Sequence, residues 1–326
     1  MKAEIIRLLK SCDGYLSGQE LCEKLNVSRT AVWKVINQLR EEGYEIEAVR
    51  NKGYRLVESA DVMTAAELES CMGDQQLGLP VKYYDKIDST NNQVRRLAEE
   101  GAEEGLLVVA ECQEAGKGRR GRVWKSPAGS GIWMSFLLKP QVGPEHASML
   151  TLVAAMAVTS GIQDITGMET KIKWPNDLVL SGKKICGILT EMSTDLDSIR
   201  YIIVGIGINV NTSDFPEDIA ATATSLYLES GKSWKRSELI AAIMKRMEQY
   251  YEIFLKTADL SGLKEEYESK LANLGRQVKV LAPKQEYCGI CRGITDGGEL
   301  LVEREDGSIS QVMSGEVSVR GIYGYV

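Results

Sequence analysis

Hydrophobic positions in the first part of the chain recur with the period of a helix. Ile5, Ile6, Leu8 and Leu9 follow this period, and Ser17 with Glu20 has the pattern of a capping box at the start of a second helix that runs to Leu25. After the short turn Asn26-Val27, Ser28 is expected to cap a third helix that runs to about Glu42 and is ended by Gly43. This spacing predicts a helix-turn-helix.

The third predicted helix has one apolar and one polar face. Its apolar positions, expected to pack inward, are Ala31, Val32, Val35, Ile36 and Leu39. Two strand-like runs, Tyr44–Glu47 and Tyr54–Leu56, then flank the turn Asn51-Lys52-Gly53 and predict a hairpin, or wing, with Arg55 as a further cation. Polar residues at the start of such a helix reach bases and phosphates. The residues expected to contact DNA are Arg29, Thr30, Trp33, Lys34, Arg50 and Lys52.

The remainder of the chain mixes strand-like and helical runs without strict alternation, which favours an α+β fold. Strand-like runs lie at 81–84, 106–110, 132–138, 185–189 and 201–204, and helical runs at about 92–100, 147–160 and 235–255. From about residue 272 short strands, the last at Val317–Val319, are separated by hairpin signals such as Asp296-Gly297-Gly298. We therefore expect domains at 1–60, 64–271 and 272–326, with residues 58–61 as a short polar joint between the first two.

Composition limits the function classes. The chain has 326 residues, 44% of them hydrophobic, and no run of 18 apolar residues, so neither a membrane span nor membrane association is expected. It starts on an amphipathic helix, and its seven irregularly spaced cysteines are typical of a cytoplasmic protein with reduced thiols. The pair Cys288 and Cys291 is expected on opposite faces of a strand, which disfavours a zinc site. The net charge of −7 excludes a uniformly basic nucleic-acid binder, so DNA contact must come from a local patch.

A loop of three glycines and four cations, Gly116-Lys117-Gly118-Arg119-Arg120-Gly121-Arg122, carries the candidate chemistry. Glycines allow the backbone to approach a ligand closely, and the cations suit a polyanion. A dinucleotide fingerprint is disfavoured because Pro127 and Gly129 prevent the helix it requires. The single histidine, His146, is not followed by a kinase catalytic loop, and Leu226 replaces the first glycine of a Walker A loop. A solvated basic loop or a nucleic-acid patch remains the alternative.

Other motifs accompany this loop: Asp88-Ser89-Thr90-Asn91, Gln113, Lys173-Trp174-Pro175-Asn176-Asp177, Gly182–Leu189 and Gly205-Ile206-Gly207-Ile208-Asn209. Together with the helix-turn-helix they closely resemble the biotin protein ligases, of the bifunctional type in which the ligase is also the repressor of the biotin operon. The resemblance covers essentially the whole chain. One departure is Lys117, where the family loop usually has arginine; the charge is retained but the planar fork is lost.

The resemblance implies an N-terminal winged helix, a central mixed α/β ligase domain like that of class II synthetases, and a C-terminal β-barrel similar to an SH3 fold. It also implies a biotin pocket, in which neutral hydroxyls and amides suit the ureido group. The biotin-binding residues it implies are Ser89, Thr90, Asn91, Gln113, Lys117, Gly118, Arg119 and Lys184. From the residues alone, a Ser or Thr at 89–90 is better explained as a helix cap.

The reaction implied by the resemblance has two steps. Biotin and ATP form biotinyl-adenylate and pyrophosphate, and a lysine of the biotin carboxyl carrier protein domain of acetyl-CoA carboxylase then takes the biotinyl group. The implied catalytic residues are Lys184, Arg119, Asp177 and Lys173, and the implied nucleotide-binding residues are Arg120, Arg122, Trp124, Asn176, Gly205, Gly207 and Asn209. Mg²⁺ is expected to enter with ATP, and Asp177 would either bind it or activate the acceptor lysine.

Alternatives remain from the residues themselves. Lys173–Asp177 alone is better explained as an ordinary strand-to-turn corner, and Gly205–Asn209 fits a tight turn at a strand end. The polar segment Asn211–Thr224 is expected to be a second loop ordered by the adenylate, which would stabilise a homodimer on operator DNA. The competing functions are a lipoate-type acyl ligase, a metabolite-sensing repressor without catalysis, and a DNA-modifying nucleotidyltransferase.

Overall fold

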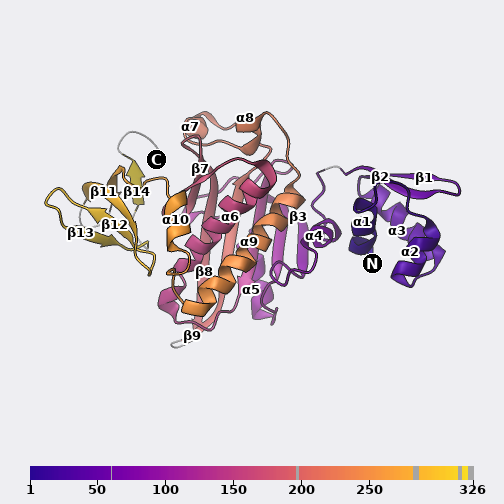
Figure 1. Ribbon diagram of the computed structural model, residues 1–326, viewed down its shortest axis with the longest axis horizontal. Helices are drawn as coiled ribbons and strands as arrows, with labels where there is room; N and C mark the ends of the chain where they lie inside the picture. Colours follow the sequence, from indigo (N-terminus) through magenta and orange to yellow (C-terminus); the bar gives the residue numbers. More distant parts are fainter. Residues whose placement is uncertain (60, 196–197, 282–285, 315–317, 322–326) are drawn as a thin grey trace.

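Three structural parts follow one another along the molecule. The computed structural model describes residues 1–59, 61–195, 198–281, 286–314 and 318–321. Figure 1 shows a helical N-terminal part, a central sheet covered by helices and a small C-terminal sheet in a row, so the predicted three-part fold is confirmed. Ala60 of the predicted joint and Val317 of the predicted last strand lie outside the described residues.

The N-terminal part is three helices and a two-stranded wing. Its elements are α1 (Lys2–Lys10), α2 (Gly18–Leu25), α3 (Arg29–Glu41), β1 (Tyr44–Val49) and β2 (Gly53–Ser59). Ser17 and Glu20 form the predicted capping box, and Ser28 caps α3 through its side chain. Between α2 and α3, Asn26 adopts a left-handed conformation with φ 52°, which lets the chain turn within two residues.

The central sheet has seven strands in the order β3-β4-β5-β9-β8-β7-β6. Their bounds are β3 (Val81–Ile87), β4 (Leu107–Gln113), β5 (Gly131–Leu138), β6 (Lys171–Lys173), β7 (Asp177–Leu180), β8 (Lys183–Asp195) and β9 (Ser198–Asn209). Only β3 and β4 pair in parallel; the other neighbours are antiparallel. A mixed sheet of this kind agrees with the α+β prediction.

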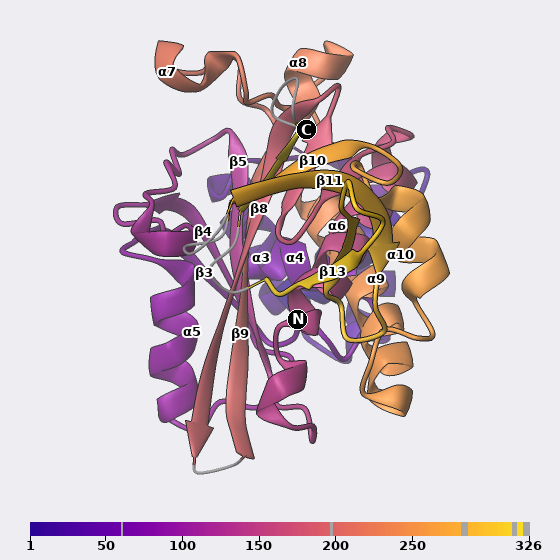
Figure 2. The same ribbon diagram turned by 90° about the vertical axis from the view of Figure 1, so that its left-hand side faces the viewer.

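Helices lie on both faces of the sheet, α5 (Thr90–Glu99) on one and α6 (Met149–Thr166) with α9 (Arg236–Thr257) on the other (Figure 2). The other helices of this part are α4 (Ala65–Met72), α7 (Glu217–Ala220), α8 (Leu226–Ser230) and α10 (Lys264–Lys270). One core lies under α6 and α9, and a smaller one under α5; neighbouring residues Phe136 and Leu137 of β5 point into different cores. The helical stretch Pro144–Thr166 is apolar enough to span a membrane, but 72% of its most apolar window is buried inside the protein. It is therefore the central core helix.

The C-terminal part is a five-stranded antiparallel sheet in the order β13-β12-β11-β10-β14. Its strands are β10 (Gln277–Leu281), β11 (Glu286–Ile294), β12 (Leu300–Glu303), β13 (Ile309–Val312) and β14 (Ser318–Gly321). As predicted, Cys288 is exposed and Cys291 buried. Trp174 of the central domain donates from Nε1 to the Gly298 carbonyl at 3.0 Å, which fixes this sheet beside the Lys173–Asp177 turn.

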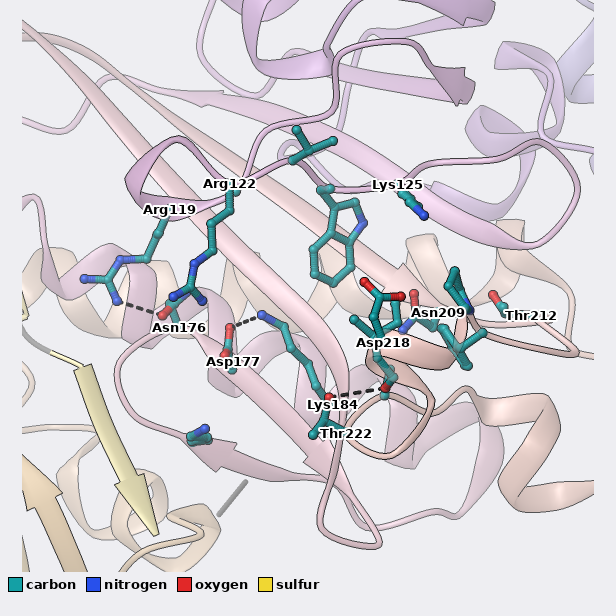
Figure 3. Close-up of a pocket in the computed structure, with 18 of the residues that line it drawn as sticks. Arg119, Arg122, Lys125, Asn176, Asp177, Lys184, Asn209, Thr212, Asp218 and Thr222 are labelled. Carbon is teal, nitrogen blue, oxygen red and sulfur yellow. Dashed lines mark hydrogen bonds and ion pairs between the residues drawn. The ribbon is translucent and has the colours of Figure 1, made fainter. Parts of the chain in front are cut away.

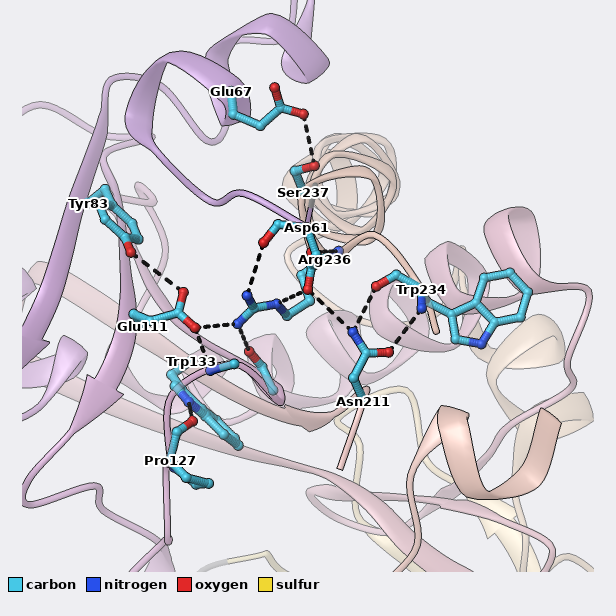
Figure 4. Close-up of polar contacts among 12 residues, drawn as sticks. Asp61, Glu67, Tyr83, Glu111, Pro127, Trp133, Asn211, Trp234, Arg236 and Ser237 are labelled. Atoms are coloured by element: carbon cyan, nitrogen blue, oxygen red, sulfur yellow. Dashed lines mark hydrogen bonds and ion pairs between the residues drawn. The ribbon is translucent and has the colours of Figure 1, made fainter. Parts of the chain in front are cut away.

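The junction between the N-terminal and central parts is built more firmly than the predicted polar joint. Arg236, at the start of α9, is 3% exposed and pairs with Asp61 at 2.5 Å and with Glu111 at 2.9 Å (Figure 4). Asp61 also accepts from Asn211 Nδ2 at 3.3 Å. A buried guanidinium with two carboxylates is satisfied on both sides, so the joint is docked on the central domain.

A second buried carboxylate joins three elements at the same junction. Glu67 of α4 is 1% exposed and accepts from Lys10 of α1 at 2.5 Å and from Tyr44 of β1 at 2.8 Å. Ser237 of α9 donates to it at 3.2 Å. Burial, followed by the nearby Glu67 charge, raises the pKa of Tyr44. The N-terminal part is therefore held against α4 and α9 by charge-assisted hydrogen bonds.

Candidate active site and nucleic-acid surface

Two adjoining hollows open at the end of the sheet where β5, β8 and β9 meet the cationic loop. The wide hollow measures about 710 Å³ and the narrow one about 50 Å³. The residues that line both are Gly118, Arg119, Trp124, Asn176 and Lys184. The structure thus brings the loop together with the Lys173–Asp177 turn and Lys184, which come much later in the sequence.

The narrow hollow has a wall of connected neutral polar groups. Gln113 Oε1 accepts from the Thr90 backbone N–H at 2.8 Å and from the Thr90 hydroxyl at 3.1 Å. Ser135 Oγ lies 2.6 Å from both Thr90 Oγ1 and Asn91 Oδ1. Ser89 is the N-cap of α5 but makes no side-chain cap bond, so the capping interpretation is wrong. Ser89, Thr90 and Asn91 are all at least 96% buried around this space.

Two glycines of β9 make room for this wall. Gly205 and Gly207 lie inside the strand, so the strand-end-turn interpretation is wrong. A Cβ on Gly205 would lie 2.1 Å from Asn91 Oδ1, and one on Gly207 would lie 2.6 Å from Trp124 Nε1. Both glycines line the narrow hollow and not the wide one. Any side chain at either position would displace a group of the site.

Lys184 stands between the hollows (Figure 3). Its ammonium donates to Asp177 Oδ1 at 2.6 Å and lies 5.1 Å from the centre of the Trp124 ring. Its backbone N–H donates to the Thr222 carbonyl at 2.7 Å, which ties β8 to the segment after α7. A partly buried ammonium with one carboxylate and one aromatic face is well placed to stabilise negative charge between the two hollows.

The cationic loop closes the top of both hollows with one 3-10 turn, Arg119–Gly121. Arg119 donates to Asn176 Oδ1 at 2.8 Å and to the Ser314 carbonyl of the C-terminal sheet. Burial lowers the pKa of Arg119, Asp177 opposes this effect, and the neighbouring cations Arg120 and Arg122 add to it. Four cations in so short a segment repel one another, and this repulsion favours an anionic ligand between them.

Lys117 has a different environment from the arginines. Its ammonium donates to Asn92 Oδ1 at 2.6 Å, on α5, and it lines only the narrow hollow. Arg120 and Arg122 line the wide hollow and are exposed. Lysine in place of the usual arginine therefore lies at the α5 side of the loop, where one point donor meets one amide oxygen.

The far wall of the wide hollow is a segment attached mainly at its ends. Asn209 donates to the Thr224 carbonyl at 3.1 Å, and Ser225 donates to the Thr212 carbonyl at 2.6 Å. Between these ends α7 is exposed along its whole length and projects from the domain (Figure 2). Thr212, Asp218 and Thr222 of this segment face the hollow (Figure 3). A short helix inside the segment was not predicted.

The Lys173–Asp177 turn supplies the floor of the wide hollow. It joins β6 to β7, so the strand-to-turn prediction is confirmed, and it also lines the hollow. Lys173 is 6% exposed. Asn176 donates to the Ile188 carbonyl at 3.2 Å while it accepts from Arg119. Among the described residues no group of three His, Cys, Asp or Glu side chains could hold a metal ion.

The predicted DNA contacts form one exposed surface on the N-terminal part. Arg29, Thr30, Trp33 and Lys34 are exposed at the start of α3, and Trp33 keeps 59% of its surface. Arg50 and Lys52 are exposed on the turn of the wing. The Lys52 ammonium lies 5.7 Å above the ring of Tyr15, and the Arg55 guanidinium 5.0 Å above it. These exposed cations are accessible to a polyanion such as DNA. That they bind DNA stays a prediction.

Comparisons with known proteins agree with this arrangement part by part. Residues 2–55 match the HTH domain model, 83–209 the Biotin/lipoate A/B protein ligase family, and 274–320 the Biotin protein ligase C terminal domain. Bifunctional ligase/repressor BirA of Bacillus subtilis is 39% identical over 98% of both chains, and that of Escherichia coli 33% identical over 97% of this chain and 96% of that one. The chain belongs to the biotin protein ligase family.

A solved structure of this family shares the central and C-terminal architecture. Biotin protein ligase from Aquifex aeolicus in complex with biotin and ATP aligns with a TM-score of 0.65 and 36% identity. The alignment covers 74% of this chain and 98% of that one. The Bacillus and Escherichia relatives match at nearly full length, so among biotin protein ligases this chain is similar to those described as both ligase and repressor.

Sequence reasoning missed several residues that build the site. Ser135 is the one hydroxyl-bearing residue within the apolar run of β5. A single hydroxyl in such a run could have indicated a residue of the site. Glu191 follows the apolar part of β8 and contacts Asn91, a hundred residues away in the sequence. Asp61 and Arg236 meet across 175 positions. No short motif marks the last three, because each acquires its role from a distant partner.

Proposed function

We propose that this biotin protein ligase forms biotinyl-adenylate from biotin and ATP, transfers biotin to a lysine of a carrier protein, and represses genes as a DNA-binding protein. One observation carries the ligase part. A narrow hollow with a wall of neutral hydroxyls and amides and a wide hollow with further cations share Lys184 and Arg119. A neutral ring and a polyphosphate can therefore meet at one pair of cations.

The narrow hollow suits the ureido ring of biotin. Thr90, Asn91 and Gln113 offer a hydroxyl and two amides, which Ser135 behind them and their own hydrogen bonds already orient. A buried charge there would need a charged partner, whereas a ureido group needs only donors and acceptors. The residues proposed to contact biotin are Ser89, Thr90, Asn91, Gln113, Lys117, Gly118, Arg119 and Lys184, which all line this hollow.

The wide hollow suits the nucleotide. In adenylation, the biotin carboxylate oxygen bonds to the α-phosphorus, and the bond to the pyrophosphate oxygen breaks. Lys184 and Arg119 would stabilise the charge that develops at the meeting point, while Arg120 and Arg122 hold the leaving pyrophosphate. Trp124, Asn176 and Asn209 would position the nucleoside and phosphates. The same cations then cover the mixed anhydride, which limits its hydrolysis.

Mg²⁺ is proposed only as the ion that accompanies ATP. Asp177 already accepts from Lys184, and Asn176 is bonded to Arg119 and to the Ile188 carbonyl. Asp177, Asp214 and Asp218 line the wide hollow, but no group of three such side chains among the described residues could hold a metal ion, so Mg²⁺ would be held mostly by phosphates. Mg²⁺ would neutralise phosphate charge when bound.

Transfer of biotin requires a neutral amine at the adenylate carbonyl. The acceptor lysine forms the amide bond, AMP leaves, and the amine loses a proton. Asp177 and Lys173 are the charged groups of the floor that would orient this lysine. The proposed acceptor is the carrier-protein domain of acetyl-CoA carboxylase. Free thiols at all seven cysteines agree with a cytoplasmic setting.

The proposal that the protein is a repressor is supported by the exposed cations of the N-terminal part and by the contacts that hold this part against the central domain. The exposed α3 and wing cations would bind operator DNA as part of a homodimer, with biotinyl-adenylate as corepressor. The junction at Asp61 connects this part to Asn211, at the base of the adenylate loop. A ligand that orders the loop would thereby favour one arrangement of the junction.

Exchange of labelled pyrophosphate into ATP tests the ligase proposal. Exchange is expected with biotin and Mg²⁺ and not with lipoate. Exchange with lipoate alone would replace the proposal with a lipoate-type ligase, and no exchange with either acid in folded protein would leave a sensing repressor. Sedimentation with and without biotinyl-adenylate tests the dimer: an unchanged dimerisation constant would refute the corepressor mechanism.

A further inference from the structure

Asn91 lines the narrow hollow. Its side-chain amide has a nitrogen that donates hydrogen bonds and an oxygen that accepts them, so its orientation decides which group a ligand meets. Its Nδ2 lies 2.7 Å from Glu191 Oε2 and 3.4 Å from the Leu189 carbonyl, and both of these groups only accept. Its Oδ1 accepts from Ser135 at 2.6 Å and lies on the Gly205 side of the hollow. The amide nitrogen is thus held by two protein acceptors, which leaves the oxygen as the end that a ligand donor can use.

Glu191 is placed between two donors. Arg95, one helical turn after Asn91 on α5, donates to Glu191 Oε1 at 2.8 Å, while Asn91 donates to Oε2. The side chain of Glu191 is 25% exposed and that of Arg95 40%. A carboxylate is the only side chain of this length that accepts on both sides. Glu191 lines neither hollow itself, so it acts on a ligand only through Asn91.

We propose that Glu191 is a positioning residue for biotin, because it fixes the Asn91 amide with its oxygen toward the ligand as the acceptor for a ureido N–H. This rests on the proposed function, since biotin is the ligand. Oδ1 has a second lone pair beyond the one that Ser135 uses. Ser135 has one hydrogen for two acceptors, Thr90 Oγ1 and Asn91 Oδ1, so it can move this hydrogen to Thr90 when the ligand donates.

Glutamine at position 191 discriminates this role from simple packing. It has the shape of glutamate but only one acceptor, and both of its neighbours donate. The charged Arg95 takes the amide oxygen, because hydrogen bonds to a charged group are the stronger ones. The amide nitrogen of the new side chain then faces Asn91 and turns its amide over. The ureido N–H of the ligand would then face the N–H of the turned Asn91 amide, and two donors cannot form a hydrogen bond with each other.

The test is a set of variants studied as full-length protein. Biotin affinity by titration calorimetry and the biotin KM for pyrophosphate exchange are compared for Glu191→Gln, Arg95→Ala and the double variant. Glu191→Gln is expected to weaken biotin about 10–100-fold with the ATP KM unchanged, since a buried donor loses its acceptor. Arg95→Ala is expected to stay within about twofold, because Asn91 keeps its carboxylate partner.

The double variant gives the decisive result. Without Arg95 the glutamine oxygen is free to face Asn91, so biotin affinity is expected to return to that of Arg95→Ala. Glu99→Gln, an exposed change on α5, is the charge control. Unchanged biotin affinity in Glu191→Gln, or no recovery in the double variant, would overturn the positioning role while wild-type exchange leaves the proposed function standing. A wild-type protein without biotin binding would overturn both.

Discussion

The narrow and the wide hollow share Lys184 and Arg119, yet their remaining walls are built in different ways. The narrow hollow is enclosed mainly by β5, β8, β9 and the start of α5, whose polar groups bond to one another, and only in part by Lys117, Gly118 and Arg119 of the cationic loop. The wide hollow is enclosed partly by the cationic loop and the segment around α7, whose residues are largely exposed. One site is formed before the ligand arrives, and the other depends on segments that a ligand would hold.

Because of this difference, the entropy cost of binding differs between biotin and ATP. A preformed polar wall recognises the biotin ring at a small ordering cost, whereas binding in the wide hollow must offset the larger entropy of ordering two loops. The segment around α7 also has a path to the N-terminal domain, through Asn211 and Asp61. We therefore propose that the sheet recognises biotin and that the segment around α7 carries the signal to the N-terminal domain.

The largest expected effect comes from the residue that both hollows share. Lys184→Ala removes the ammonium beside Asp177 and should lower the exchange rate by about 10²–10³-fold, as for loss of one preorganised charge stabiliser. Lys183→Ala, at the exposed neighbouring position, is the matched control. Equal rates for the two variants would remove Lys184 from the chemistry.

The second largest effect is expected from a substitution that changes only the narrow hollow. In Gly205→Ala the added carbon would collide with Asn91 Oδ1, and biotin affinity should fall by about 10–100-fold, with ATP affinity unchanged. Gly14→Ala, where a Cβ meets nothing within 4 Å, serves as control. Calorimetric titrations of both ligands measure the effect; equal losses for biotin and ATP would contradict the separation of the hollows.

The opposite selectivity is expected at the base of the α7 segment. Asn211 donates to the Trp234 carbonyl at 2.9 Å and accepts from the Trp234 N–H at 2.9 Å. Asn211→Ala should raise the ATP KM by about 5–10-fold and leave biotin affinity unchanged, since one anchor of the loop is lost. Ser213→Ala is the exposed control. A change in biotin affinity alone would show that the segment belongs to the other hollow.

The smallest effect concerns acid stability at the edge of the narrow hollow. The hydrogen bond from Arg96 lowers the pKa of Asp88 to about 2, despite some burial, and Asn92 adds to this. A lowered pKa stabilises the fold above the unfolded value near 3.8, and this stabilisation is lost as pH falls toward about 2. Because the pair is partly exposed, the contribution is about 1 kcal/mol or less. Denaturant unfolding of Asp88→Asn should show a correspondingly smaller loss of stability between pH 4 and 2.

Short-range signals in the sequence predicted the structure well. Ser17 and Ser28 cap the helices expected after them, because a cap depends on three or four neighbouring residues. The α+β class and the main strands followed from hydrophobic period. The short elements β7, α10 and β13 were not anticipated, since four to seven residues carry too little period to recognise.

The residues of the site also fall into two groups, those that short motifs predicted and those that they did not. Motif residues of the loop and the Lys173–Asp177 turn were placed together by the fold, as the resemblance implied. Ser89 was expected as a cap on local grounds, but its hydroxyl makes no cap bond, and Thr90 bonds to Gln113 on β4 instead. Glu191 and Arg236 depend on partners from other elements, so local patterns hold no information about them.

Hydrogen exchange measured on the free protein, with biotin, and with biotin plus ATP tests the contrast between the hollows most directly. The amides of Ile132–Leu138 and Thr90–Val94 should be protected in all three states. Those of Ser213–Ala221 should become protected only when biotin and ATP are both present, and those of Gly116–Arg122, which belong to both hollows, should be protected most strongly in that state. Strong protection of these two loops in the free protein, or none in the presence of both ligands, would contradict the account.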